Sequence, residues 1–229
     1  MTTQAPFSAT VAGVPLDRVM TALRRDRPVF HSEADLQHGF ARALWDAAPG
    51  VHSRLEVPRR RPGRAEYLDL LCLGPEGGQT LIEFTYFTRD WTGTLPGPPD
   101  EEYRLRNHGA DDLARLRFVE DVVRLEAFCD RPDRNGLAIL VTNAPALWTA
   151  PKPRPTPPRD REFRLHEGRT LTGTLRWAGG TYAPNTRHLR GSYPLAWQPY
   201  SHLPGPGGLF RYLAVPVAPG AEPDTPVTA

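Results

Sequence analysis

Two acidic residues lie inside two strongly apolar segments of the chain. Asp69 lies within the segment 67–73, and Glu83 lies within the segment 80–87. A turn of five residues, 74–78, separates the segments, and a regular antiparallel hairpin centred on this turn pairs positions whose numbers sum to 152. Asp69 and Glu83 then face each other from one side of the sheet, with their β-carbons roughly 4.5–5.5 Å apart.

Two carboxylates this close repel each other, and the sheet is destabilised unless a cation compensates their charge. Mg²⁺ favours carboxylate and water oxygens in a compact octahedron. Asp69 and Glu83 are therefore predicted to be ligands of Mg²⁺ or Mn²⁺. The alternative is that both acids face solvent at a sheet edge, but apolar neighbours such as Leu70 and Ile82 argue against it. A bulge in either strand would shift the register and remove the pairing.

Apolar periodicity and capping signals predict the elements around this hairpin. Ser32 and Asp35 form an S-x-x-D capping box that begins a helix ending at Pro49. The other elements predicted before residue 144 are a helix over 15–25, strands over 51–57 and 137–142, and a helix over 110–129. Residues 90–102 are rich in Gly, Pro and acidic residues and are predicted to form a loop. This order of elements predicts an α/β or α+β fold.

The remaining third of the chain carries no motif that indicates a function. Residues 149–161 are proline-rich and predict an extended connector, after which strands over 163–176, 193–197 and 210–217 either extend the sheet or pack beside it. The predicted organisation is an N-terminal arm and helix over 1–30, a core over 31–148, a connector over 149–162, a β extension over 163–217 and a disordered tail over 218–229.

The order of the acids resembles the PD-(D/E)XK superfamily of restriction endonuclease-like nucleases. In that family an αβββαβ core carries an acid on its second strand and an acid-x-Lys motif on its third, and a glutamate on the first helix often joins the metal site. In this chain Glu33 lies on the first core helix, Asp69 on one strand, and Glu83 with Thr85 on the next. The match covers about residues 30–143.

The resemblance implies a mixed central sheet flanked by helices, with additional C-terminal β-strands. It implies a metal-dependent endonuclease, a hydrolase that cleaves phosphodiester bonds of DNA. It further implies that Asp69, Glu83, Thr85 and Glu33 are catalytic, and that Asp69, Glu83 and Glu33 bind Mg²⁺ or Mn²⁺. For Glu33 the alternative is an acid that only favours the helix dipole from the first turn.

Thr85 departs from the family pattern, which has lysine at this position, and Leu68 stands where the pattern has proline. The family lysine orients the attacking water and stabilises charge on the phosphate, whereas threonine carries no charge. Three alternatives stay open. A relocated cation could replace the lysine, with Lys152, Arg54 and Arg89 as candidates. The metal alone could activate the water, or catalysis could be lost while the fold is retained.

The densest basic cluster lies in the turn before Asp69. On a hairpin that flanks a metal site, such a cluster is predicted to bind the phosphate backbone of nucleic acid. A solvated turn is the alternative. The predicted nucleic-acid-binding residues are Arg54, Arg59, Arg60, Arg61 and Arg64.

Composition and motifs exclude several other classes. The two cysteines are far apart, which excludes a zinc finger and gives no disulfide framework. The sequence shows no basic-then-apolar leader and no apolar stretch near 18 residues, so we expect a bacterial, cytoplasmic protein without a membrane span. The motifs of P-loop, dinucleotide-binding, zinc protease and α/β-hydrolase enzymes are absent.

These observations predict a Mg²⁺-dependent nuclease acting on DNA. A catalytically inactive nucleic-acid-binding or assembly subunit with the same fold is the second hypothesis, and a homodimer or a partner subunit is compatible with both. The third is a globular protein whose acids only resemble a site.

Overall fold

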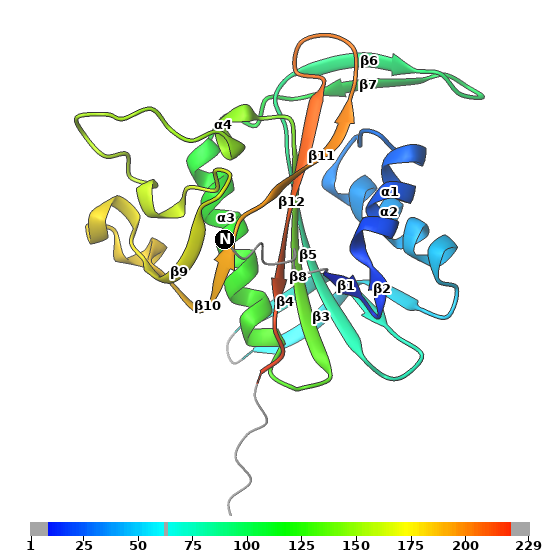
Figure 1. Ribbon diagram of the computed structural model, residues 1–229, viewed down its shortest axis with the longest axis horizontal. Coiled ribbons are helices and arrows are strands. Elements are labelled where there is room, and N and C mark those ends of the chain that lie inside the picture. The colour runs from blue at the N-terminus through cyan, green and yellow to red at the C-terminus, as the bar shows by residue number, and fades with distance from the viewer. Residues whose placement is uncertain (1–8, 62–63, 221–229) are drawn as a thin grey trace, which may run out of the picture.

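A six-stranded mixed sheet forms the centre of the molecule (Figure 1). The computed structural model describes residues 9–61 and 64–220 of the 229-residue chain, with the backbone alone for 60, 61, 64 and 65. Across the sheet the strands run β11 (Trp197–His202), β12 (Leu209–Val217), β8 (Arg134–Thr142), β5 (Gln79–Phe87), β4 (Arg64–Leu73) and β3 (His52–Arg61). The predicted mixed sheet flanked by helices is confirmed.

Strands β5 and β8 are parallel and form the middle of the sheet, whereas every other neighbouring pair in the sheet is antiparallel. Both strands are buried over most of their length. Parallel strands covered on both faces have near-continuous apolar sequences, which is how these two segments read. Helix α3 (Asp111–Phe128) lies between them in the chain and makes the crossover that a parallel connection needs.

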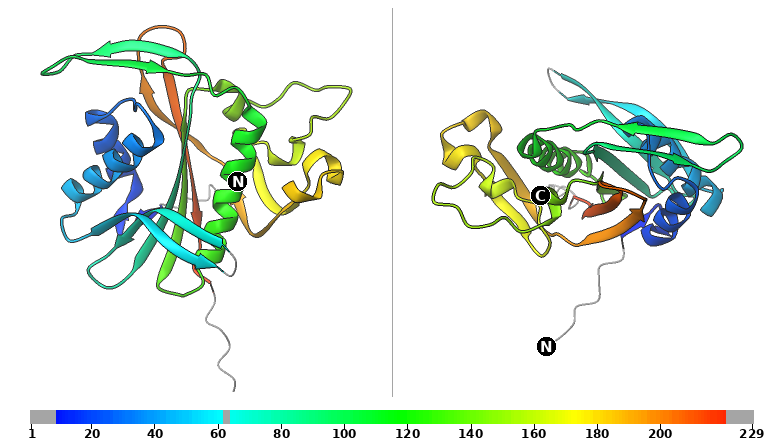
Figure 2. Two further views of the ribbon diagram at one scale, coloured as in Figure 1. Left: turned by 180° about the vertical axis from the view of Figure 1, so that it is seen from behind. Right: turned by 90° about the horizontal axis from the view of Figure 1, so that it is seen from above.

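Helices cover both faces of the sheet (Figures 1 and 2). On one face α1 (Leu16–Asp26) and α2 (Glu33–Ala47) share a buried apolar cluster with β4, β5 and β8. On the other face α3 shares a second cluster with the same three strands. The predicted cap of α2 is confirmed, because the hydroxyl of Ser32 accepts a hydrogen bond of 3.2 Å from the backbone N–H of Asp35. Within the described ranges, no helix is long and apolar enough to cross a membrane.

The prediction of a loop over residues 90–102 is wrong. This region contains β6 (Trp91–Leu95) and the start of β7 (Glu101–Leu105), which pair as an antiparallel hairpin separate from the main sheet. Trp91, Tyr103 and Leu105 are buried and hold the hairpin against the body of the protein. The Gly and Pro residues that suggested a loop lie mainly in the turn between the two strands.

The C-terminal third both extends the sheet and packs beside it. Strands β11 and β12 extend the sheet through antiparallel pairing of β12 with β8. Strands β9 (Thr170–Leu175) and β10 (Arg187–Pro194) form a separate pair beside α3. The remaining short elements are β1 (Thr10–Val11), β2 (Val14–Pro15), α4 (Pro145–Trp148) and the 3-10 turns η1 (Arg161–Phe163), η2 (Trp177–Gly180) and η3 (Ala183–Asn185).

Two strand predictions in this third need correction. The predicted strand 163–176 begins only at Thr170, because the buried Phe163 lies in η1 and the buried Leu165 lies in irregular backbone. The predicted strand 193–197 spans the boundary at which β10 ends and β11 begins. Residues 149–160 contain no helix or strand.

The predicted terminal segments fall partly outside the described residues, which exclude 1–8 and 221–229. The start of the predicted tail is attached to the body, since the backbone N–H of Gly220 donates a hydrogen bond of 2.7 Å to the carbonyl oxygen of Cys129.

A buried ion pair joins the connector to α3. The guanidinium of Arg115 donates to the carboxylate of Asp160 over 2.6 Å, and both side chains are 3% exposed. Arg115 also donates to the carbonyl oxygen of Ala146, and Arg164 donates to Asp160 over 3.0 Å. Because these charges are satisfied mainly by each other, loss of one partner leaves the other buried without compensation.

We predict that Asp160→Ala lowers the free energy of unfolding by about 3–5 kcal/mol, since it leaves the Arg115 guanidinium buried without its counter-charge. Urea unfolding followed by circular dichroism measures the change. Asp26→Ala is the matched control, because it removes the exposed partner of Arg25 and should have little effect. An equal decrease in the free energy of unfolding in the two variants would contradict a stabilising role for the buried pair.

Candidate functional site

The predicted register of β4 and β5 is confirmed, and their ladder ends one position before the two acids. The pairs run from Leu73↔Gln79 to Leu70↔Ile82, and in each pair the residue numbers sum to 152. Asp69 and Glu83 occupy the next position, where β4 and β5 no longer pair, whereas β5 continues beside β8 to Phe87. The acids therefore lie at a fork in the sheet.

A local rotation of β3 and β4 accompanies this fork. Alternate residues of a regular strand face one side of the sheet, yet Leu70 packs with α1 and α2 while Leu68 packs with α3. Leu55 and Val57 on β3 show the same change of side. Glu56 lies between them with a φ of +51°, a left-handed conformation that non-glycine residues rarely adopt. Asp69 is carried on the rotated part of β4.

The backbone of β5 binds Asp69 at the fork. The Oδ2 atom of Asp69 accepts a hydrogen bond of 2.7 Å from the backbone N–H of Phe84. Glu83 precedes Phe84, is fully buried, and lies close enough to Asp69 for the charge of Asp69 to raise the pKa of Glu83. The structure thus brings the two predicted ligands together.

Helix α3 supplies an arginine and a third acid to the same site. The Nη2 atom of Arg124 donates to Oε2 of Glu83 over 2.7 Å and to Oδ1 of Asp121 over 2.9 Å. Thr85 donates its hydroxyl hydrogen to Oδ2 of Asp121 over 2.8 Å. The predicted site residue Thr85 therefore contacts the acid cluster through Asp121.

Sequence reasoning missed both Asp121 and Arg124. A signal for Asp121 was present, because it falls at helical spacing among Ala114, Phe118 and Leu125, all of which are buried. An acid within such a stripe is buried unless the helix turns it away from the core. For Arg124 no comparable signal exists, since arginines are common throughout this chain.

Glu33 approaches the cluster from the start of α2. Its Oε2 atom accepts a hydrogen bond of 2.8 Å from the backbone N–H of Tyr86. Burial of its carboxyl group raises its pKa, and repulsion from Asp69 contributes. Glu33 is thus within electrostatic range of the acid pair, although part of its side chain keeps contact with solvent.

All four carboxyl groups have raised pKa values. Burial and repulsion from Asp69 outweigh the attraction of Arg124 and raise the pKa of Glu83 to about 10. Burial raises the pKa of Asp121 to about 7, against the attraction of Arg124. Burial also raises the pKa of Asp69 and of Glu33. Fully ionised, these carboxyl groups would carry more negative charge than the half-buried guanidinium of Arg124 compensates, so without a cation the cluster retains protons.

One oxygen of the cluster lacks a donor. The Oε1 atom of Glu83 is buried and accepts no hydrogen bond from any residue within 9–61 or 64–220. The neighbouring Asp69 carboxyl group donates only when it is protonated. A proton or a cation therefore has to satisfy this oxygen, because a buried acceptor without a partner is costly.

The acid pair fits a divalent cation that keeps several waters. Mg²⁺ is commonly bound by one or two carboxylates, with water completing the octahedron. Asp69 and Glu83 supply those carboxylates, and the unsatisfied Oε1 atom of Glu83 is a free ligand oxygen. In the described part of the chain, no three His, Cys, Asp or Glu side chains group as metal ligands, and the role of Glu33 as a third ligand stays a prediction.

A cavity of about 1220 Å³ adjoins these acids. The start of α2, strands β4 and β5, the residues after β7 and one side of α3 line it. Figure 2, in its left view, shows these elements with the β6–β7 hairpin above them. Asp69, Thr85 and Asp121 are among its lining residues, so part of the acid cluster is reachable from outside.

The three arginine or lysine residues proposed as a relocated cation lie elsewhere. Lys152 is exposed in the connector, and the guanidinium of Arg54 donates to the carbonyl oxygen of Ser53. Arg89 donates to Asn107 and forms an ion pair with Asp111. Arg124 is instead the cation that contacts the acids.

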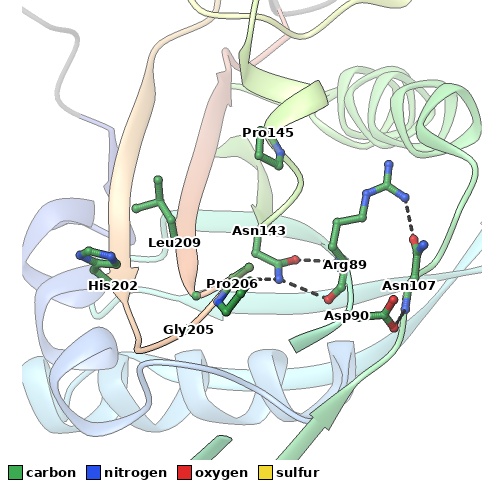
Figure 3. Close-up of a pocket in the computed structure, with 11 residues that line it drawn as sticks. Arg89, Asp90, Asn107, Asn143, Pro145, His202, Gly205, Pro206 and Leu209 are labelled. Carbon is green, nitrogen blue, oxygen red and sulfur yellow. Dashed lines mark hydrogen bonds between the residues drawn. The ribbon is translucent and has the colours of Figure 1, made fainter. Parts of the chain in front are cut away.

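Arg89 lines a second, smaller cavity of about 460 Å³ (Figure 3). Asn143 is the buried polar residue of this cavity. Its amide oxygen accepts from the backbone N–H of Arg89, and its amide nitrogen donates to the carbonyl oxygens of Arg89 and Gly207. The amide thus joins three segments of the chain and has a structural role.

The predicted basic cluster is only partly described. Arg54 is exposed, whereas Arg59 is half-buried and its pKa is lowered by burial and by repulsion from Arg134. Neither residue lines the cavity beside the acids. The side chains of residues 60, 61 and 64 lie outside the described part, so their predicted contacts with nucleic acid stay predictions.

Comparison of the chain with protein-family models, with curated proteins and with solved structures finds no significant match. A function therefore has to be inferred from the geometry of the site.

We predict that, without metal, the free energy of unfolding falls as the pH rises from the ordinary pKa of Glu83, 4.5, towards its folded value of about 10. In this range Glu83 keeps its proton in the native state but releases it in the unfolded chain. Each unit of pH therefore lowers the free energy of unfolding by about 1.4 kcal/mol for one full proton, starting from the value present below the ordinary pKa. Urea unfolding at a series of pH values measures the slope.

Glu83→Gln is neutral at every pH and should flatten this part of the curve. Glu76→Gln is the control, because Glu76 is exposed in the turn between β4 and β5 and should leave the slope unchanged. The same slope in both variants would show that Glu83 does not hold the proton.

Proposed function

We propose that the protein is a Mg²⁺-dependent nuclease of the PD-(D/E)XK type that hydrolyses phosphodiester bonds in DNA. The observation that carries the proposal is the pairing of Asp69 and Glu83 at the fork of the sheet. There, Asp69 lines a cavity together with other charged residues, and the fully buried Glu83 beside it carries an unsatisfied carboxylate oxygen. Buried carboxylates with raised pKa values beside a cavity mark a candidate functional site.

The order of elements supports the same proposal. Helix α2, strands β3, β4 and β5, helix α3 and strand β8 follow one another as in an αβββαβ core. Strands β3, β4 and β5 form an antiparallel meander, and β8 lies parallel to β5. The acids lie on the second and third strands of this unit, which are the positions that the resemblance predicts.

Each residue of the site has a proposed role. Asp69 and Glu83 would hold the metal, which when bound would supply an activated water and stabilise charge on the phosphate. Arg124 keeps a positive charge beside Glu83, where the family lysine would otherwise lie on β5. Thr85 orients Asp121, which in turn positions Arg124. Glu33 contacts the backbone of β5 and supports the geometry of the strand.

The ion pairs of Arg124 also favour a second candidate function. The guanidinium binds both Glu83 and Asp121, and so compensates part of the charge that a metal would compensate. If Arg124 keeps these ion pairs, it takes the place of the metal between the acids. The protein is then a nucleic-acid-binding or assembly subunit without catalytic turnover.

We expect the protein to nick supercoiled plasmid DNA with Mg²⁺ or Mn²⁺, and Asp69→Asn and Glu83→Gln to abolish nicking because each removes a metal-binding charge. Agarose gel electrophoresis measures nicking, and calorimetry measures metal binding. Glu76→Gln is again the control and should retain full activity. Nicking activity that remains in each of the two variants would contradict the proposed site. DNA binding without cleavage or metal binding would support the second candidate.

Arg124→Ala should slow cleavage by about 10²–10³-fold, which is the usual effect of removing one preorganised donor that stabilises the transition state. Arg124→Lys should retain more activity than Arg124→Ala, because it keeps the charge. Adding Thr85→Lys to the Arg124→Ala variant should restore part of the rate, because it returns a cation to β5. Single-turnover rates measure these effects, and equal rates for the alanine and lysine variants of Arg124 would contradict the role of its charge.

A further inference from the structure

Three arginines line the acid-site cavity without partners of their own. The side chains of Arg104, Arg106 and Arg117 form no hydrogen bond and no ion pair with any residue that the structure describes. The two other arginines of the cavity are paired, Arg124 with Glu83 and Asp121, and Arg187 with Glu120. An exposed arginine needs no partner, so the meaning of these three depends on where they lie.

Two separate elements bring the three guanidinium groups to one cavity. Arg104 lies on β7 and Arg106 directly follows the end of that strand, and both line the cavity. Arg117 lies on α3 seven residues before Arg124, which places the two on the same face of the helix, two turns apart. Arg117 is close enough to the acid cluster for its charge to lower the pKa of Glu33.

The β6–β7 hairpin is held firmly where it carries these arginines. Tyr103 and Leu105 are buried, and the ring of His31 stacks on Tyr103 with a centroid distance of 4.1 Å. The hydroxyl of Thr88 donates to the carbonyl oxygen of Arg106 over 2.8 Å. Arg104 and Arg106 are therefore presented by a fixed backbone while their own side chains stay exposed.

We propose that Arg104, Arg106 and Arg117 bind the phosphodiester backbone of the nucleic acid that enters this cavity, an inference that rests on the proposed nuclease function. Guanidinium groups bind phosphate through paired hydrogen bonds, and the acids of the cluster attract no phosphate themselves. The cavity thus pairs an acidic part suited to a metal with a basic part suited to the substrate. This basic part differs from the arginine cluster predicted in the β3–β4 turn.

Fluorescence anisotropy with labelled single-stranded and duplex oligonucleotides, in buffer with EDTA and in buffer with Ca²⁺, tests the proposal apart from cleavage. The wild-type chain should bind with a strong salt dependence. The triple variant Arg104→Ala/Arg106→Ala/Arg117→Ala should reduce the slope of log affinity against log salt by about 2 for a single strand or about 3 for a duplex, the values for three phosphate contacts.

The matched control is Arg18→Ala/Arg24→Ala/Arg154→Ala, which removes the same charge from exposed side chains outside the cavity. Thermal unfolding should show that both variants fold, since all six side chains are exposed. A decrease in this slope that occurs only in the cavity variant, with either oligonucleotide, supports the proposal. Equal decreases in slope in the two variants, or no oligonucleotide binding by the wild-type chain in either buffer, would overturn the proposal. The plasmid assay reports separately on the proposed nuclease function.

Discussion

The burial of several carboxyl groups around one guanidinium is the constraint on which this structure depends. Glu83 and Asp121 face each other between β5 and α3, Asp69 reaches Glu83 from β4, and Arg124 is the cation that contacts them. A purely structural core would favour apolar side chains at these positions, because the free energy needed to desolvate a buried charge exceeds the stabilisation that its ion pair provides. The fold instead keeps an excess of acid there, and a proton or a cation has to compensate it.

The fork in the sheet makes this arrangement possible. Where β4 leaves β5, the backbone N–H of Phe84 loses its strand partner, and the carboxylate of Asp69 replaces it. The rotation of β3 and β4 at Glu56 turns that part of the hairpin towards α3. The crossover of α3 then brings a helix face across the acids. Arg124 can therefore supply from a helix the positive charge that a lysine at the position of Thr85 would supply from the strand.

The β6–β7 hairpin adds a second surface to the same cavity. Its buried aromatic side anchors it between the residues just before α2 and the start of β12, as the contacts of Tyr103 with His31 and of Trp91 with Phe210 show. Its exposed side carries arginines towards the acids. Two of the three arginines thus come from an element that supplies none of the acids, whereas Arg117 lies on α3 together with Asp121.

The sequence by itself determined the mixed α/β class, the cap of α2 and the β4–β5 register, because all three follow from local periodicity and turn length. Asp69 and Glu83 stood out as acids within apolar segments, whereas Glu33 and Thr85 became candidates only through the resemblance to a nuclease pattern. The end of the ladder at the acids, the approach of Asp121 and Arg124, and the β6–β7 hairpin were decided by tertiary structure. These depend on contacts between residues far apart in the chain, such as Arg124 with Glu83, which no local pattern encodes.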